Sequence, residues 1–487
     1  MTRPTTTGKA QDLITFTRST TGTALAKISY GEEVVTNGDF ASDSDWGYAP
    51  IRWRWSSGRM ERHDGSGNDP FYQSFNIVEG KTYKITYDVE YVSGGSTTNV
   101  FIDTGAGFIT PVSINGSGTA VGYFMAQATK LLQFQIYAIG TFRGFVDNVS
   151  VKEVLYDQPD GTLQLFNHPI NKPRIEYDAS GNCLGLLVEE ARTNFVTQSS
   201  NLASSFWSAS SGNAITANNV VSPDGTVTAD KYAVTAGVNY LANSGVTVTA
   251  QAYTFSQFVK YGNAQWIQLN FAQGADHTAW FDIESGVVGT RSAGISSSSI
   301  TNVGNGWFKC SITRTATAGN LIIVSARPRN ADNSASSTVG DYCYAWGSQL
   351  ETGTFPTSYI PTSGSTVTRA ADVASLAVSK FGYNQDQGTV SIGINNNRGV
   401  AGALGDGTFN NDLRFGVVGS NIGRGTGSGF AKNVTTGVFS GQSKIAIGIQ
   451  EDNYSSAGDG AGAGVNDTSA SLPPNPVNIY IGKDYGN

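Results

Sequence analysis

The sequence predicts an all-β protein of tandem jelly-roll or β-sandwich domains joined by extended connectors. Glycine supplies 59 of the 487 residues, whereas charged residues make up only 14% and aromatic residues 11%. Soluble domains average roughly 7% glycine and about 25% charged residues. Such a composition suits many short strands joined by tight turns, with enough aromatic bulk for real cores. No convincing amphipathic helix longer than two turns is present.

The predicted strands alternate apolar and polar residues, which places one face of each strand on a core. Residues 82–92, TYKITYDVEYV, show this best, because every second residue from Tyr83 to Tyr91 is apolar or aromatic. Other predicted strands of this kind cover residues 131–140, 145–154, 253–261 and 320–329. These short strands, separated by turn sequences, indicate sandwiches.

The chain also repeats a sandwich-sized unit. Residues 83–91 (YKITYDVEY) and 253–261 (YTFSQFVKY) share Tyr, Val and Tyr at identical offsets, which indicates two related modules. The predicted parts are an N-terminal extended attachment segment (1–30), an inserted jelly roll (31–157), a connector (158–194), a second jelly-roll sandwich (195–355), an extended connector (356–373) and a third β domain (374–487). We expect the second connector to lie along a surface without forming a strand, because its prolines restrict the backbone.

The third domain is predicted from four strand-like segments in a glycine-rich context. They are residues 388–396, 412–419, 443–450 and 477–483. The sequence stops just after the last of them, so we expect the exposed strand edge to be covered by another segment.

Several classes of function are disfavoured. A net charge of −7 without a basic run argues against nucleic-acid binding. We find neither a secretory signal nor an apolar stretch long enough to span a membrane. The three histidines are scattered and no HExxH or CxxC spacing occurs, so we expect no zinc site. Cys310 and Cys343 are expected to be buried free thiols, with a bridge between them as the alternative.

The stretch GLLVEEARTN (185–194) places two carboxylates beside an arginine, as a glycosidase does. Adjacent residues of a strand point to opposite faces, however, whereas paired catalytic carboxylates must converge at about 5–9.5 Å. We therefore expect no catalytic residue and predict a structural connector. Its residues are Glu189, Glu190, Arg192 and Asn194, with Arg192 paired to a nearby carboxylate.

A ligand site is predicted in the stretch of residues 48–64, YAPIRWRWSSGRMERHD. Its candidate glycan-binding residues are Tyr48, Arg52, Trp53, Arg54, Trp55 and Arg59. Sugar rings stack on aromatic side chains, and a few polar groups fix their hydroxyls. Two other interpretations remain open: the WRW alternation puts both tryptophans on one face, which suits a sandwich core, and the stretch also suits a protein interface.

A structural calcium ion is the one cofactor that the sequence suggests. Asp39 and Asp147 are its candidate ligands, with Asp43 and Asp45 nearby in the sequence. Carboxylate oxygens suit Ca²⁺, and the site requires the first and last strands of the insert to pair.

Three segments together resemble a family of bacteriophage virion structural or tail-fibre-like proteins. They are LITFTRSTTGTAL (13–25), residues 171–207 and QLETGTFPTSYIPTSGSTVTRAAD (349–372). With the intervening module the resemblance covers more than half the chain. It implies a non-enzymatic fibre, spike or decoration component, made in the host cytoplasm and mounted on the virion. Its expected partners are other virion proteins, further copies in a homotrimer, and host-surface glycans bound during host attachment.

The sequence departs from this family in two places. In the family the first segment runs soon into the second, whereas here the insert separates them. The insert resembles a carbohydrate-binding jelly roll through Asn37, Gly38, Asp39, Phe40, Trp46, Asp147, Asn148 and Val149. Ala41 replaces the glutamate usual in such modules, which weakens the case for calcium.

The third domain resembles a concanavalin or laminin-G sandwich around NIYIGK, without the usual closing strands. We expect either that another subunit supplies the missing edge by strand addition or that the sequence is incomplete. Two alternatives to the virion hypothesis are the binding part of a polysaccharide depolymerase and a capsid cement protein without a receptor role.

Overall fold

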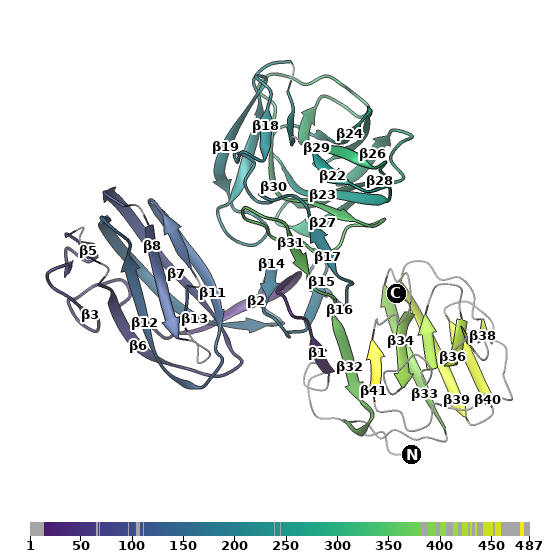
Figure 1. Ribbon diagram of the computed structural model, residues 1–487, viewed down its shortest axis with the longest axis horizontal. Coiled ribbons are helices and arrows are strands. Elements are labelled where there is room, and N and C mark those ends of the chain that lie inside the picture. The colour runs from purple at the N-terminus through teal and green to yellow at the C-terminus, as the bar shows by residue number, and fades with distance from the viewer. Residues whose placement is uncertain are drawn as a thin grey trace. The chain divides into compact units, whose positions relative to one another are not determined.

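The computed structural model describes residues 14–380, apart from gaps at 65, 66, 68, 96, 104–107, 111, 238 and 244, and only strand backbone from 381 onward. As predicted, the fold is all-β (Figure 1). The one described helix is a 3-10 turn, Val378–Lys380, and no described helix is long and apolar enough to cross a membrane.

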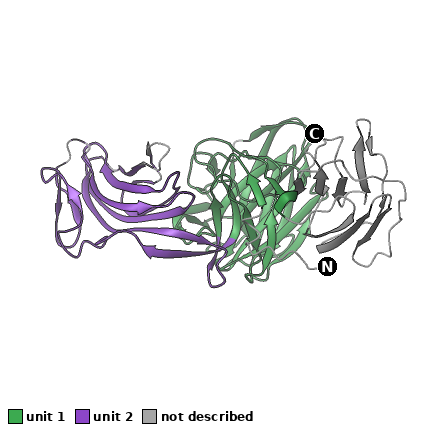
Figure 2. Ribbon diagram, turned by 90° about the horizontal axis from the view of Figure 1, so that it is seen from below, with its two compact units in different colours: residues 1–25, 165–487 green, residues 26–164 purple. Residues whose placement is uncertain are grey.

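The chain divides into two compact units. Unit 2 comprises residues 26–164, and unit 1 comprises residues 1–25 together with 165–487 (Figure 2). The insert predicted over 31–157 therefore falls inside unit 2, and the chain of unit 1 resumes after it.

Unit 2 is a sandwich of two antiparallel sheets. One has the order β10 (Ser113–Asn115), β8 (Thr97–Asp103), β12 (Lys130–Ala138), β6 (Phe71–Ile77) and β3 (Gly47–Tyr48). The other contains β11 (Gly118–Met125), β7 (Thr82–Ser93), β13 (Arg143–Tyr156) and β2 (Gly22–Glu33), with β4 (Trp53–Trp55) paired to β5 (Met60–Arg62). The alternation in β7 places Tyr83, Ile85 and Tyr87 in an aromatic core with Phe71 and Phe134.

Unit 1 contains the second sandwich. One sheet has the order β18 (Trp207–Ala209), β21 (Leu241–Asn243), β29 (Gly319–Arg329), β24 (Trp266–Gln273), β25 (Ala275–Asp282) and β26 (Val287–Arg291). The other has the order β19 (Asn213–Val220), β20 (Ala229–Val234), β30 (Tyr342–Thr352), β23 (Ala252–Tyr261), β28 (Trp307–Thr315) and β27 (Ser297–Gly304). Cys310 and Cys343 are buried in its core as free thiols, as expected, and Cys183 is free and exposed.

The repeat seen in the sequence is also a repeat of topology. The sheet order β11-β7-β13 in unit 2 matches β28-β23-β30 in the second sandwich. The facing sheets match in the same way, because β8-β12-β6-β3 corresponds to β24-β29-β21-β18. Each of these seven strands of one sandwich therefore has a counterpart that comes at the same point in the chain order of the other.

The third domain contains strands at all four predicted places: β33 (Gln387–Asn395), β35 (Leu413–Gly416), β39 (Gln442–Gln450) and β41 (Asn478–Ile481). β1 (Ile14–Thr17) pairs with β32 (Val373–Ala377), which in turn pairs with β41. Part of the N-terminal segment that we expected to be an extended attachment segment is thus a strand in this sheet. The side chains of the third domain from residue 381 onward lie outside the described residues.

The connectors are more ordered than the sequence suggested. Residues 174–187 form a hairpin of β15 (Arg174–Tyr177) and β16 (Cys183–Leu187), and β17 (Arg192–Asn194) pairs with β31 (Val367–Arg369). The prediction that residues 356–373 lie along a surface without a strand was wrong. Thr357, Tyr359, Ile360 and Thr362 are at most 5% exposed. Their burial is possible because neighbouring groups satisfy their backbone, as when Ser199 Oγ accepts from Thr362 N at 2.9 Å.

Candidate functional site

Three buried arginines and two carboxylates form an ionic cluster in unit 1. Arg18 precedes β2, Arg174 lies in β15 and Arg369 lies in β31, and the carboxylates belong to Glu189 and Asp372. The three arginine side chains and that of Asp372 are at most 1% exposed. These five residues, called here the junction cluster, come from three segments of the chain, 13–25, 171–207 and 349–372.

The two carboxylates are shared among the three arginines. Asp372 accepts from Arg18 at 3.0 Å and also from Arg174. Glu189 pairs with Arg174 at 2.9 Å and lies 3.4 Å from Arg369. The Ser358 backbone and hydroxyl donate to Glu189 at 2.7 and 2.6 Å. The cluster thus closes a network between residues up to 354 positions apart in sequence.

Burial and charge set the ionisation of this cluster. Burial alone disfavours the charged form of Glu189, but the charges of Arg369 and Arg174 and the Ser358 hydrogen bonds outweigh it and lower the pKa of Glu189. Burial lowers the pKa of Arg369, a guanidinium that nevertheless remains charged at neutral pH. Because arginines and hydrogen-bond donors occupy these carboxylates, the arrangement suits structural cross-linking better than proton transfer.

The predicted connector residues join this cluster to the second sandwich. Glu189 points into the cluster, whereas the Glu190 side chain is 58% exposed and pairs with Arg192. Asn194 is fully buried and donates to the Ser348 and Ile360 carbonyls at 3.1 and 2.9 Å. The two glutamates therefore point in different directions and do not converge on one bond.

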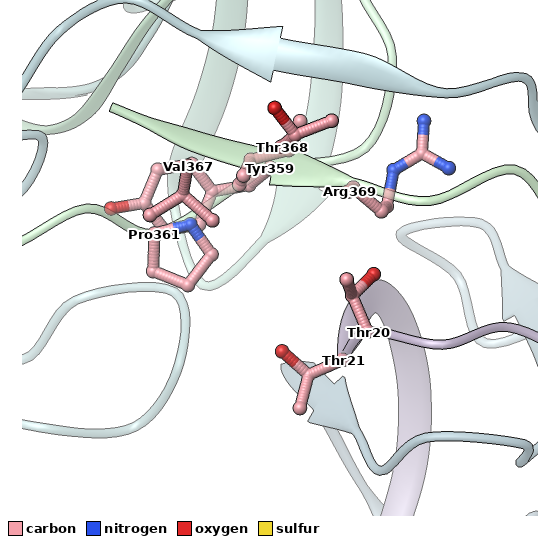
Figure 3. Close-up of a pocket in the computed structure, with 8 residues that line it drawn as sticks. Thr20, Thr21, Tyr359, Pro361, Val367, Thr368 and Arg369 are labelled. Atoms are coloured by element: carbon pink, nitrogen blue, oxygen red, sulfur yellow. The ribbon is translucent and has the colours of Figure 1, made fainter. Parts of the chain in front are cut away.

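A small hollow lies beside the junction cluster (Figure 3). Threonines and Arg369 line it, together with Tyr359, Ile360, Pro361 and Val367. Its cavity volume of about 40 Å³ lies far below the ~300–1,000 Å³ of typical ligand pockets. We therefore do not assign a ligand to it.

One residue of the predicted glycan site in residues 48–64, Trp53, requires a correction. Trp53 is fully buried in the core of unit 2, and its indole donates to the Asp69 carbonyl at 2.8 Å. Trp55 is half-buried and its indole donates to the Phe40 carbonyl. The WRW alternation turns both rings toward the core, so Trp53 has no surface on which a sugar could stack.

The polar side chains of that stretch form ion pairs or hydrogen bonds with neighbouring residues. Arg52 pairs with Asp64 and Asp69, Arg54 pairs with Glu61, and Arg59 pairs with Glu90 and lies over the Phe145 ring. Tyr48 donates to Asp43 at 2.8 Å. Each of these four side chains therefore has a partner within unit 2.

The two candidate calcium ligands each hold a local backbone hydrogen bond. Asp39 accepts from Ala41 N at 3.4 Å, and Asp147 accepts from Asn148 N at 2.7 Å. Burial raises the pKa of Asp147, with help from the charges of Asp88 and Asp39. In the part of the chain that the structure describes, no group of three carboxylate, histidine or cysteine side chains is placed to hold a metal ion.

The sequence analysis missed a surface on the other side of unit 2. The outer face of the sheet β10-β8-β12-β6-β3 carries a row that crosses four strands, in which Gly47 lies beside Tyr72, Tyr72 beside Gln135, and Gln135 beside Phe101. Neighbouring rows extend it. The surface, called here the amide–aromatic face, consists of Tyr72, Ser74, Asn76, Asn99, Phe101, Leu131, Gln133, Gln135 and Tyr137, none of which is charged.

The side chains of this face support one another. The rings of Phe101 and Tyr137 pack edge to face, with centroids 4.8 Å apart. Tyr137 donates to Gln135 at 3.0 Å, and Gln135 donates to Gln133 at 2.5 Å. The side-chain amide oxygen of Asn99, Oδ1, is buried without a hydrogen-bond partner in the described structure. The alternation of each strand was visible in the sequence, but only the register brings the rings and amides together.

Comparison with known proteins identifies no family. No protein-family model matches the chain, and neither does any curated protein. Among solved structures, it matches a tandem pair of CBM22 domains from Paenibacillus barcinonensis at 9% identity, covering 68% of this chain and 100% of the other, with a TM-score of 0.22.

Two further matches are equally distant. A Paenibacillus cycloisomaltooligosaccharide glucanotransferase matches at 12% identity over 61% of this chain and 46% of its own, with a TM-score of 0.18. An anti-sigma factor domain-containing protein from Clostridium clariflavum matches at 10% identity over 70% of this chain and 99% of its own, with a TM-score of 0.17. Scores this low carry no argument about the present chain.

Proposed function

We propose that this chain is a non-enzymatic structural protein of a bacteriophage particle that contacts neutral glycans of the host surface through the amide–aromatic face. The observation that carries the glycan part is the chemistry of that face. Its rings offer apolar surfaces to the C–H faces of sugars, and its amides can donate to and accept from hydroxyls. Because none of the nine side chains that define this face is charged, the face suits an uncharged saccharide.

The junction cluster supports the virion part of the proposal. Arg18 belongs to the first segment that resembles virion proteins, Arg174 and Glu189 belong to the second, and Arg369 and Asp372 belong to the third. The ion pairs bind these segments into one folded body, which is what a rigid particle component requires. Unit 2 enters that chain as an insert, so an adhesive module carried by a structural scaffold is the arrangement we propose.

The glycan proposal is tested by binding of neutral polysaccharides in affinity electrophoresis and calorimetry. Phe101→Ala and Gln135→Ala should each weaken binding roughly tenfold, since each removes contact surface or hydrogen bonds worth about 1–2 kcal/mol. Val121→Ala is the matched control, because Val121 lies on the outer side of β11 in the opposite sheet. Equal binding by all three variants and the unaltered chain would refute the role of this face.

The virion proposal is tested on purified particles. Mass spectrometry should find the chain among the particle proteins, and antibody labelling in electron microscopy should place it on the particle surface. Light scattering of the isolated chain tests the proposed homotrimer. Release of oligosaccharides from a host polysaccharide would instead favour a depolymerase, and attachment to capsids without binding to host cells would favour a cement protein.

A further inference from the structure

The second sandwich has a face that corresponds to the amide–aromatic face, but its chemistry differs. In the register of β25, β24 and β29, Trp280 lies beside Gln268 and Gln268 beside Arg327, while Trp266 lies beside Arg329 in the next row. Their neighbours Ile267, Leu269 and Phe281 face the core, so these polar residues point outward. The outward set, called here the covered face, is Trp266, Gln268, Asn270, Thr278, Trp280, Arg327 and Arg329.

Arg329 is a buried cation held by neutral groups. It is 3% exposed, and its Nε and Nη2 both donate to Gln268 Oε1, at 2.8 and 2.6 Å. Its Nη1 donates to the Ala335 carbonyl at 2.9 Å and to Ser337 Oγ at 2.8 Å. No described carboxylate lies within 4.0 Å of its guanidinium nitrogens. Burying a charge without a counter-charge is costly, so this site is better suited to an anion than to its present contacts.

Arg327 adds a second cation to the same face. Its Nε is buried without a hydrogen-bond partner in the described structure, and it too forms no ion pair there. Asp276 and the tyrosines Tyr232 and Tyr240 are the acidic groups close enough to affect it. Two neighbouring guanidiniums beside a tryptophan form the set of donors that would bind a sugar ring bearing a carboxylate.

Residues 330–338, called here the strap, contact the part of the covered face that contains Trp280 and Arg329. The Trp280 indole donates to the Ser334 carbonyl at 2.9 Å. Asp332 accepts from Thr290 N and Thr290 Oγ1, both at 2.8 Å. The close approach also requires Gly289, because a Cβ there would lie 2.3 Å from Asp332 Oδ1 and 2.6 Å from the Trp266 ring.

The strap's contacts resemble those of a ligand. Backbone carbonyls and one serine hydroxyl accept from Trp280 and Arg329, as sugar oxygens could. The strap, NADNSASST, has no large apolar residue. Hydrogen bonds therefore contribute much of the free energy that attaches the strap to the sheet. A carboxylate binds arginine through charge-assisted hydrogen bonds, which are stronger than the hydrogen bonds to neutral oxygens that hold the strap.

We propose that the covered face is a binding site for a carboxylate-bearing saccharide, closed by the strap until such a ligand displaces it. The site is separate from the amide–aromatic face and does not depend on the neutral-glycan proposal. The chain would then have two sugar-binding sites. The amide–aromatic face is exposed and binds neutral sugars, whereas the covered face is closed by the strap and binds acidic sugars.

The test loosens the strap without touching the covered face. Asp332→Ala removes both hydrogen bonds to Thr290, and Thr290→Val removes one of them at an exposed position. The probes are oligogalacturonate and its fully methyl-esterified form, which differ in charge but share a backbone. Asp332→Ala should bind oligogalacturonate about tenfold more tightly than the unaltered chain, because more molecules have an open site. Thr290→Val should give a smaller gain in the same direction.

Arg327→Gln in the Asp332→Ala background should abolish the gain. Circular dichroism and melting curves show whether each variant is folded, and Thr290→Val keeps the test valid if Asp332→Ala is not. The proposal is overturned if the folded, loosened variants bind no more tightly than the unaltered chain. It is equally overturned if they bind the ester as well as the acid, or if acetate alone competes at the same concentration as oligogalacturonate.

Discussion

The two sandwiches share their topology, but the equivalent outer sheet face is exposed in unit 2 and covered in the second sandwich. In unit 2 the connection from β12 to β13 is four residues long, 139–142, and leaves the amide–aromatic face open. In the second sandwich the corresponding connection from β29 to β30 is twelve residues long, 330–341, and its first part is the strap. The two sandwiches therefore differ in one loop beside a topologically equivalent sheet face, and loops on a fixed scaffold commonly vary function in this way.

The chemistry of the two faces follows the same division. The open face carries amides, hydroxyls and aromatic rings, which water solvates at little cost. The covered face carries Arg327 and Arg329, whose charges lose hydration through burial. Burial, with the neighbouring charge of Arg327, lowers the pKa of Arg329 to about 10. An anion would therefore stabilise the two guanidiniums of the covered face. The residues that define the amide–aromatic face include no cation that an anion could pair with.

The largest expected effect separates core from face within unit 2. Trp53→Ala should destabilise unit 2 by about 3–5 kcal/mol, because it empties a fully buried site in the core. Chemical denaturation followed by tryptophan fluorescence measures this loss. Tyr72→Ala on the amide–aromatic face is the control and should cost less than about 1 kcal/mol. If Trp53→Ala left stability intact but abolished sugar binding, our assignment of the two surfaces would be reversed.

A comparable effect should be confined to unit 1. Asp372→Asn removes the charge that neutralises buried Arg18 and Arg174, and breaking such a pair costs about 3–5 kcal/mol. Hydrogen exchange should show faster opening of β17 and β31, with β7 and β13 of unit 2 unchanged. Glu190→Gln is the matched control, because its side chain is 58% exposed and its pair with Arg192 should contribute little. Equal losses from both variants would argue against a special role for the buried cluster.

These contrasts also show where sequence reasoning stops. Alternation in residues 83–91 and 253–261 was sufficient to predict both strands and the repeat, but it predicted the single buried face only in 83–91, because residues 253–259 are buried on both faces. The ion pair between Arg18 and Asp372 was not predictable, because it joins residues 354 positions apart across a fold that no local pattern specifies. The WRW motif shows a different limit, since core packing and sugar stacking favour the same aromatic residues. The amide–aromatic face depends on cross-strand register, which the sequence does not state.

A change of pH should act on unit 1 through His168. Burial, reinforced by the charges of Arg174 and Arg18, lowers the pKa of His168 from 6.5 to about 3. The folded pKa is below the unfolded one, so the unfolded chain takes up the proton first. The stability associated with neutral His168 is therefore complete above about pH 6.5 and is lost as the pH falls toward 3, by about 1.4 kcal/mol per unit.

The pH effect is measured from the free energy of unfolding of unit 1 between pH 7 and 5. His168→Asn should lower stability at pH 7 but flatten the slope over this range. An unchanged slope in the variant would assign the pH dependence over this range to groups other than His168. Hydrogen exchange of β14 (Thr162–His168) localises the response.

The smallest effect tests the strap itself. Trp280→Phe removes the indole N–H that donates to the Ser334 carbonyl while keeping an aromatic ring on the covered face. One neutral hydrogen bond contributes about 1 kcal/mol, so global stability should change little, whereas hydrogen exchange within residues 330–338 should quicken about fivefold. Trp53→Phe offers the matched change in unit 2, where the indole donates to Asp69. It should reduce the stability of unit 2 without affecting the strap, because that ring lies in a core. If Trp280→Phe instead destabilised the whole second sandwich as a core substitution would, the strap would be an integral part of the fold and could not serve as a removable cover.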